Sequence, residues 1–146
     1  MSPFYVSKTK RIYMIADDEL KKIFKTCNVI AVVGCSRDPN KDAHKVPQYL
    51  KEHGYDIIPV NPHADQIFGE RARHSITEVG DADLVSVFRP SKDCLEVVKE
   101  ALSIHPQVIW MQVGIENKEA AKLAEEKGIT VIMDRCIMTE HRRLMK

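Results

Sequence analysis

The chain has 146 residues, 44% of them hydrophobic, so it is long enough to bury the core of one domain and short for a two-domain enzyme. Its 22 Lys and Arg residues balance 21 Asp and Glu residues, and a formal net charge of +1 gives no field that would attract nucleic acid or an anionic membrane. We find no apolar run of the roughly 20 residues that span a bilayer and no secretory signal, and therefore expect a cytoplasmic protein.

Cysteine and histidine spacing argues against metal and disulfide chemistry. The four cysteines are far apart and form no C-x-x-C pair, and the six histidines form no pair typical of a zinc helix. We therefore expect no metal site, and reduced thiols at Cys27, Cys35, Cys94 and Cys136.

The first elements are an N-terminal arm over residues 1–15 and a short helix. Asp17 is the expected N-cap of this helix, since a short carboxylate can accept hydrogen bonds from the first free N–H groups. Three apolar residues at helical spacing supply the buried stripe: Leu20, Ile23 and Phe24.

The next stretch predicts a strand, a turn, a polar loop and a helix. Val29–Val33 is apolar and rich in β-branched residues, which is typical of a strand buried on both faces. Gly34 allows a sharp turn and close approach of another backbone or a ligand. Val46 and Leu50 lie at helical spacing, and Gly54 is placed to end that helix. In such a unit the loop and helix N-terminus direct free N–H groups at one spot, so we expect a phosphorylated cofactor there.

The second strand is expected at Asp56–Val60, where Pro59 indicates a sheet edge or a strand end facing a ligand. A short strand is expected near Ile67. Ser75 and the glutamate three residues later have capping-box spacing, which predicts one or two helical turns.

Three further strands complete the pattern, with helices between them. The third covers residues 83–88 and is followed by Ser91, an expected helix cap. The fourth covers 108–113 and the fifth 129–133, and a last basic helix is expected over 139–146.

This alternation predicts a single Rossmann-like α/β domain over residues 1–146, with a doubly wound parallel sheet of five strands covered by helices on both faces. We expect the strand order 3-2-1-4-5. Ligands of such sheets bind at the carboxyl ends of the strands, at the switch point, here expected between strands 1 and 4. The segments that follow the strands are therefore candidate binding residues: 34–45, 61–63, 89–91 and 112–115.

The loop after the first strand does not fit NAD. A dinucleotide site needs G-x-G-x-x-G and an acidic residue at the end of the second strand, whereas this chain keeps only Gly34 and carries Asn61 where the acid belongs. No Walker-type G-K-[ST] is present either. The loop instead offers hydroxyl and cationic donors suited to a ligand with more phosphate: Ser36, Arg37, Lys41, His44 and Lys45.

At the strand ends the chain carries VVGCSRDPNK, VPQYLKEHGYDIIPVNP, VSVFRPS, VIWMQVGI and DRC in succession. This succession resembles the small stand-alone coenzyme A-binding proteins, whose domain is similar to the CoA-binding domain of succinyl-CoA synthetase. The resemblance extends from Val29 to the C-terminus.

The resemblance implies a position for each part of CoA. The diphosphate would lie on the first loop, on Gly34, Ser36, Arg37 and Lys41, with Cys35, His44 and Lys45 beside them. Adenosine would border Asn61, Pro62 and His63, and the nucleotide or its 3′-phosphate would touch Phe88, Arg89 and Pro90. The pantetheine arm would border residues 112–115, including Gln112, Gly114 and Ile115. For the 3′-phosphate the cation is Arg89 or Lys41.

We expect a module that binds CoA or an acyl-CoA as a carrier, sensor or partner subunit, without a catalytic group of its own. Two alternatives stay open. One is an enzyme of acyl-CoA or CoA-disulfide metabolism, either half of a ligase or a thiol enzyme using Cys136 or Cys35. The other is an NAD-binding redox sensor. Pairing with a second copy or with a ligase-type subunit is compatible with both.

Overall fold

The computed structural model describes residues 15–145. The expected arm therefore lies outside the described residues, apart from Ile15, which is buried. The elements that follow are those that position the candidate site.

The centre of the molecule is a five-stranded sheet in which every neighbouring pair is parallel. Its strands are β1 (Val29–Val33), β2 (Asp56–Val60), β5 (Leu84–Val87), β6 (Val108–Met111) and β7 (Thr130–Ile132). These are the five strands expected from the apolar runs. β1 and β2 have the expected bounds, and β5, β6 and β7 are each shorter than expected by one or two residues at one or both ends. The Rossmann-like fold class is confirmed.

The strand order requires a correction. The sheet runs β2-β1-β5-β6-β7, which is 2-1-3-4-5 along the chain, whereas we expected 3-2-1-4-5. β5 pairs with the free side of β1, from Ile30 opposite Leu84 to Val33 opposite Val87. On the outer side of β2, Arg73 instead donates its backbone N–H to the carbonyl of Pro59. Because the winding reverses between β1 and β5, the switch point lies between these two strands.

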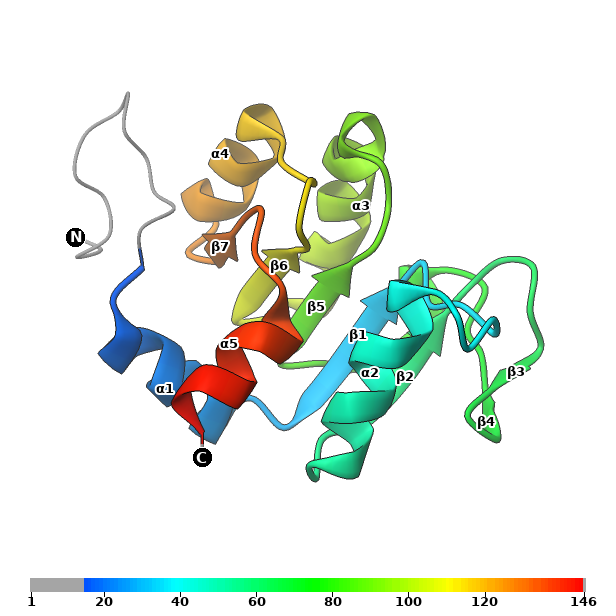
Figure 1. Cartoon of the computed structure of the whole chain (residues 1–146). Coiled ribbons are helices and arrows are strands. Elements are labelled where there is room, and N and C mark those ends of the chain that lie inside the picture. The colour runs from blue at the N-terminus through cyan, green and yellow to red at the C-terminus, as the bar shows by residue number, and fades with distance from the viewer. Residues whose placement is uncertain (1–14, 146) are drawn as a thin grey trace.

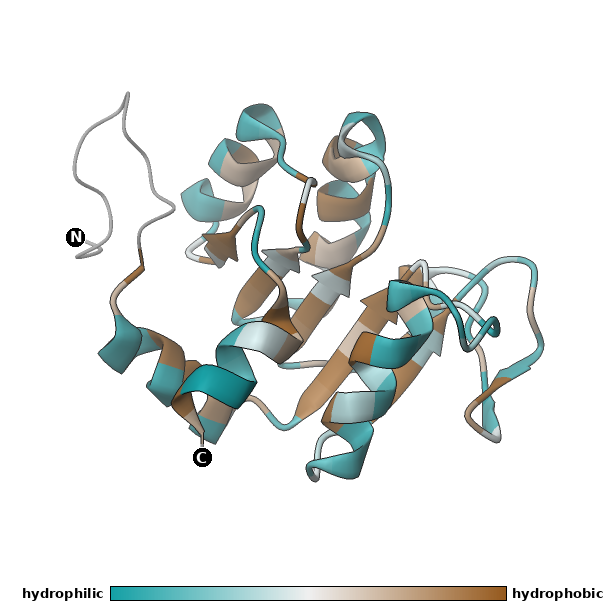
Figure 2. Cartoon of the chain, in the orientation of Figure 1, coloured by the Kyte–Doolittle hydropathy of each residue, from teal (hydrophilic) through white to brown (hydrophobic). Residues whose placement is uncertain are grey.

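Helices cover both faces of the sheet, as expected (Figure 1). α1 (Asp17–Thr26), α2 (Asp42–Glu52) and α5 (Ile137–Leu144) lie on one face, while α3 (Cys94–Ala101) and α4 (Lys118–Glu126) lie on the other. Three 3₁₀ turns connect the remaining segments: η1 (Ile76–Glu78), η2 (Ser91–Asp93) and η3 (Leu102–Ile104). Two apolar layers result, one on each side of the strands, and Figure 2 shows the hydrophobic strands between helices with hydrophilic outer surfaces.

Two expected helix caps are wrong, because each side chain has a partner elsewhere. Ala16, not Asp17, precedes α1, and Asp17 receives two hydrogen bonds from Arg143. Ser91 lies in η2, where its hydroxyl accepts a hydrogen bond from the backbone N–H of Glu116 at 3.0 Å. The expected cap at Ser75 is confirmed, since its hydroxyl accepts from the N–H of Thr77.

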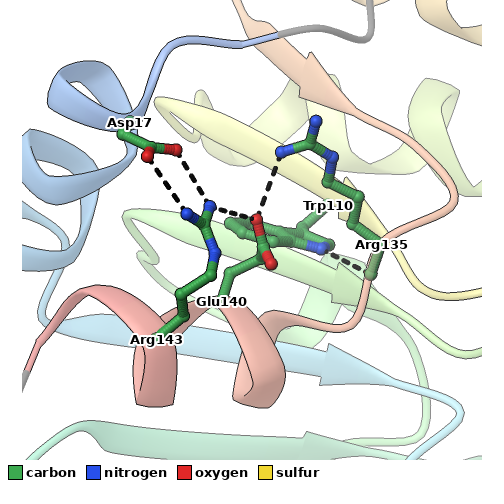
Figure 3. Close-up of polar contacts among 5 residues, drawn as sticks. All are labelled: Asp17, Trp110, Arg135, Glu140 and Arg143. Carbon is green, nitrogen blue, oxygen red and sulfur yellow. Dashed lines mark hydrogen bonds and ion pairs between the residues drawn. The ribbon is translucent and has the colours of Figure 1, made fainter.

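The first and last helices are joined by a chain of charges (Figure 3). Arg143 donates to both carboxylate oxygens of Asp17, at 3.0 and 2.9 Å, and also to Glu140. Glu140 accepts a further bond from Arg135, whose backbone carbonyl receives the indole N–H of Trp110. These contacts hold the segment after β7 at the carboxyl edge of the sheet.

A small antiparallel hairpin lies beyond β2, formed by β3 (Gln66–Ile67) and β4 (Glu70–Arg71). It confirms the short strand expected near Ile67. β2 is an edge strand of the main sheet, as Pro59 indicated.

Candidate functional site

Gly34 joins the carboxyl ends of three strands. Its φ of +86° is unfavourable for other residues, and its N–H donates to the carbonyl of Val60 at 3.0 Å. A Cβ at this position would lie 2.5 Å from the carbonyl oxygen of Phe88. Glycine is therefore required here for close approach of β1 and β5 as well as for the turn.

The loop after Gly34 is folded back on the start of α2. The backbone N–H of Ser36 donates to the carbonyl of Ala43, and the carbonyl of Ser36 lies 2.7 Å from Nδ1 of His44. The hydroxyl of Ser36 accepts from the N–H of Asp38. These contacts of Ser36 shape the loop and, among the described residues, leave the O–H of its hydroxyl as a free donor.

Several backbone donors of this loop are free. Within residues 15–145, the N–H groups of Cys35, Arg37, Asp42 and Ala43 have no hydrogen-bond partner, and Lys41 at the N-cap of α2 supplies no side-chain cap. Cys35 is fully buried, so its unpartnered N–H is costly unless a ligand accepts from it. Free N–H groups at a helix N-terminus bind anions, phosphates above all.

The cations of the loop are also free. Arg37, Lys41 and Lys45 are exposed, and in the part of the chain that the structure describes none of them forms an ion pair. Arg89 differs, because its guanidinium donates to Asp93 at 2.8 Å while its Nε is buried without a partner. Three cations are therefore available to an anionic ligand on the α2 side of the loop.

The thiol of Cys35 points into the core. Burial raises its pKa to about 12, so it is a poor nucleophile. The backbone carbonyl of Cys35 accepts a hydrogen bond from the side chain of Asn61 at 2.8 Å. The part of Cys35 that contacts Asn61 is therefore its backbone carbonyl and not its thiol. Cys136, at the N-cap of α5, is half-buried.

Asn61 ties the end of β2 to the first loop. Besides its bond to Cys35, its side-chain oxygen accepts from the N–H of His63 at 2.7 Å. Both ends of the amide are thus occupied within the protein. Pro62 and His63 are exposed beside it.

The fourth candidate segment divides into a buried part and an exposed part. Gln112 is buried, and its amide donates to Ser86 and accepts from the N–H of Ile137, so its polar atoms are not available to a pantetheine arm. Gly114 is exposed and donates its N–H to Asp134 at 2.7 Å. Val113 between them is 66% exposed, and Ile115 is half-buried.

A cleft of about 290 Å³ opens at the switch point, on the α3 side of Gly34. Three of the sequence-predicted residues line it: Gly34, Pro62 and Arg89. The rest of its wall was not predicted and comprises Val33, Val60, His74, Ser75, Ile76, Asp93, Glu96, Val97 and Glu100. The three acids recur at helical spacing, a signal in the sequence that could have placed them on one face of α3. They make this cleft unfavourable for phosphate, in contrast to the α2 side.

Among residues 15–145, no group of three or more His, Cys, Asp and Glu side chains is placed to hold a metal ion. None of the helices within that range has the length and apolar composition needed to cross a bilayer.

Comparison with known proteins identifies the family. A family model described as a CoA binding domain matches residues 28–142, which include every strand of the sheet. The chain belongs to the CoA-binding domain family.

The relatives of this CoA-binding domain include free-standing and larger proteins. The uncharacterized protein YneT of Bacillus subtilis is 43% identical over 84% of this chain and 92% of its own length. The alpha subunit of acetate–CoA ligase [ADP-forming] II of Pyrococcus furiosus is 30% identical over 79% of this chain, which matches only 28% of that subunit. A solved structure of a hypothetical protein from Pyrococcus horikoshii superimposes with a TM-score of 0.89 at 35% identity, covering 97% of this chain and all of that one.

The ends of β1, β2 and β5 of this CoA-binding domain meet at one place. Direct contacts join Gly34 to Phe88 and Val60, and Cys35 to Asn61. The end of β6 lies further along the same edge, and its Glu116 is bonded to Ser91 after β5.

Proposed function

We propose that this chain binds coenzyme A, free or acylated, at the carboxyl edge of its sheet. The diphosphate would lie on the loop after Gly34 and on the N-terminus of α2. The observation that carries this proposal is the set of unpartnered backbone N–H groups at Cys35, Arg37, Asp42 and Ala43 beside unpaired cations. Membership of the CoA-binding domain family supports CoA as the ligand of this site.

The distribution of charge supports a position for the rest of the ligand. Phosphates are favoured on the α2 side, where Arg37, Lys41 and Lys45 are free, and disfavoured in the cleft, where Asp93, Glu96 and Glu100 lie. The uncharged parts of CoA would therefore occupy the cleft and the edge towards Gly114. For the same reason we assign the 3′-phosphate to Lys41 and not to Arg89, which is neutralised by Asp93.

The state of Asn61 argues against the NAD alternative. A dinucleotide site needs a free carboxylate at the end of β2 to accept from both ribose hydroxyls. Asn61 supplies no carboxylate, and its amide is occupied by Cys35 and His63. We therefore expect weak or undetectable NAD binding.

Isothermal titration with CoA, dephospho-CoA and NAD tests the proposal. We expect CoA to bind most tightly, dephospho-CoA about tenfold more weakly because a charge-assisted contact is lost, and NAD most weakly. Equal or tighter binding of NAD would overturn the assignment.

We propose a binding role without a catalytic group: a carrier, sensor or partner subunit. The acetate–CoA ligase relative favours one alternative, in which the chain supplies the CoA-binding part of a ligase reaction. Mixing the chain with acetate, CoA and ATP and measuring ADP release tests whether the chain catalyses this reaction without a partner. Turnover by the chain alone would favour the enzyme, and turnover of CoA disulfide that is lost in Cys136→Ser would favour a thiol enzyme.

A further inference from the structure

His44, in the first turn of α2, is held in one tautomer. Nδ1 of His44 lies 2.7 Å from the carbonyl oxygen of Ser36, and a carbonyl oxygen can only accept. Nδ1 therefore carries a hydrogen whether the ring is neutral or charged. In the neutral ring Nε2 is then an acceptor, and it becomes an N–H donor only in the imidazolium form.

The ring of His44 also contacts an aromatic ring of the β3–β4 hairpin. Phe68 at the tip of the β3–β4 hairpin packs against it, with ring centroids 4.6 Å apart and planes inclined by 47°. Phe68 has a φ of +60° and is followed by Gly69 at +73°, so both central residues of this two-residue turn are left-handed. Such turns normally take Asn or Gly, because the left-handed region is unfavourable for a phenylalanine. The strained position places an aromatic ring against His44.

Charged and titratable groups of both signs lie on the elements around His44. Arg37, Lys41 and Lys45 lie on the same loop and helix, and Asp38 and Asp42 offset them in part. On the hairpin, Glu70 is paired with Lys51 at 3.3 Å, and Asp65 after β2 lies 3.7 Å from His74. Arg71 and His63 are further charged or titratable groups there, and α2 also carries Tyr49 and Glu52. A diphosphate bound on this loop would add negative charge beside the ring, and negative charge favours the imidazolium form.

We propose that His44 contacts a ligand phosphate through Nε2–H as an imidazolium, so that CoA binding takes up a proton. This inference rests on the proposed function, because it needs a phosphorylated ligand on the loop. Neutral His44 presents a lone pair to the phosphate and repels it, so affinity falls as pH rises. We expect the Kd for CoA to increase about tenfold between about pH 6 and pH 8.

Calorimetry in two buffers tests the proposal on the full chain. At one pH near neutrality, CoA is titrated in buffers with different ionisation enthalpies, and the difference in observed enthalpy gives the protons taken up. His44→Asn keeps an amide donor for the Ser36 carbonyl but cannot titrate, so we expect no proton uptake and a pH-independent Kd. His105→Asn removes an exposed histidine before β6 and is the matched control, with uptake unchanged.

A second variant and a spectrum keep the test independent of folding. Phe68→Asn suits the left-handed turn but removes the ring, so the hairpin is kept, and we expect proton uptake to fall because His44 is less well held. The ¹⁵N spectrum of the imidazoles should show the Nδ1–H tautomer for His44 in the free protein and the imidazolium with CoA bound.

The possible failures are separable. CoA binding without proton uptake in the native protein, or uptake that persists in His44→Asn, would overturn this inference and leave the proposed function standing. Failure of CoA to bind at any pH would overturn the proposed function and this inference with it.

Discussion

The carbonyl oxygen of Phe88 lies against the hydrogen-bearing face of Gly34, 2.5 Å from where a Cβ would be built. This oxygen belongs to backbone at the end of β5, so it cannot move aside as a flexible side chain would. Gly34→Ala should therefore lower the free energy of unfolding by about 3 kcal/mol or more, since it combines a left-handed alanine with a backbone clash. Urea denaturation followed by circular dichroism measures the loss.

Gly54→Ala is the matched control for this prediction. Gly54 also has a positive φ, of +96°, but no atom lies within 4 Å of the position that a Cβ would take there. Only the conformational cost remains in this variant, about 1 kcal/mol. Equal losses of unfolding free energy in the two variants would show that the carbonyl oxygen of Phe88 does not approach Gly34 closely.

Lys41 and Arg89 should contribute differently to discrimination between CoA and dephospho-CoA. Lys41 is exposed and unpaired among the described residues, whereas Arg89 is engaged with Asp93. Lys41→Ala should weaken CoA binding about tenfold and leave dephospho-CoA binding nearly unchanged, because the lost contact is to the 3′-phosphate. Titration calorimetry with both ligands measures this ratio.

Arg89→Ala is expected to weaken the binding of CoA and of dephospho-CoA to the same extent, because Arg89 lines the cleft that both ligands would occupy. Loss of discrimination in Arg89→Ala and its retention in Lys41→Ala would reverse the assignment of the 3′-phosphate. Raised salt should weaken CoA binding in the native protein more than in Lys41→Ala.

His141 makes stability depend on pH in the acid range. It is buried among Phe24, Tyr49 and Tyr55, and Nδ1 lies 2.9 Å from the hydroxyl of Tyr49. Burial, and then the nearby His53, lower the pKa of His141 in the folded protein. The unfolded chain therefore binds the proton more readily, and this contribution is present above about pH 6.5 and lost as pH falls through the folded pKa.

His141→Phe should reduce the loss of stability at acid pH, because it removes the titrating group and keeps an aromatic ring. At neutral pH the variant should be less stable by about 1 kcal/mol, since the hydroxyl of Tyr49 loses its partner. Thermal melts between about pH 5 and pH 8 check both expectations, with exposed His105→Asn as the control. A variant whose melting temperature falls with acid as steeply as the native protein's would contradict the role of His141.

The fold class was predictable because the necessary signals are local. Val29–Val33 is a short apolar run ending in a glycine, and that pattern alone indicates a buried strand and a sharp turn. The strand order was not predictable in the same way. An apolar strand is equally able to pair on either side, and only the packing of β5 against β1 decides which.

The wrong cap at Asp17 and the internal hydrogen bonds of Gln112 both involve partners distant in sequence. Asp17 is not a cap because Arg143, 126 residues away, binds its carboxylate. Gln112 was correctly placed at a strand end, but its amide is taken by Ser86 and Ile137 from other elements. Position along a strand is thus encoded locally, while the direction of a side chain at its end depends on the assembled neighbours.

The four cysteines should differ sharply in reactivity, which bears on the thiol-enzyme alternative. Burial raises the pKa of Cys27 and Cys94 to about 11 and that of Cys35 to about 12, so near pH 8 only about one thiol in a thousand, or fewer, is ionised. Cys136 is the one that is not fully buried. Iodoacetamide should therefore add a single group rapidly to the native protein, and three more only after unfolding, as counted by intact-mass spectrometry. Cys136→Ser should take up no rapid label; rapid alkylation in that variant would place a reactive thiol at a buried position and reopen Cys35 as a candidate.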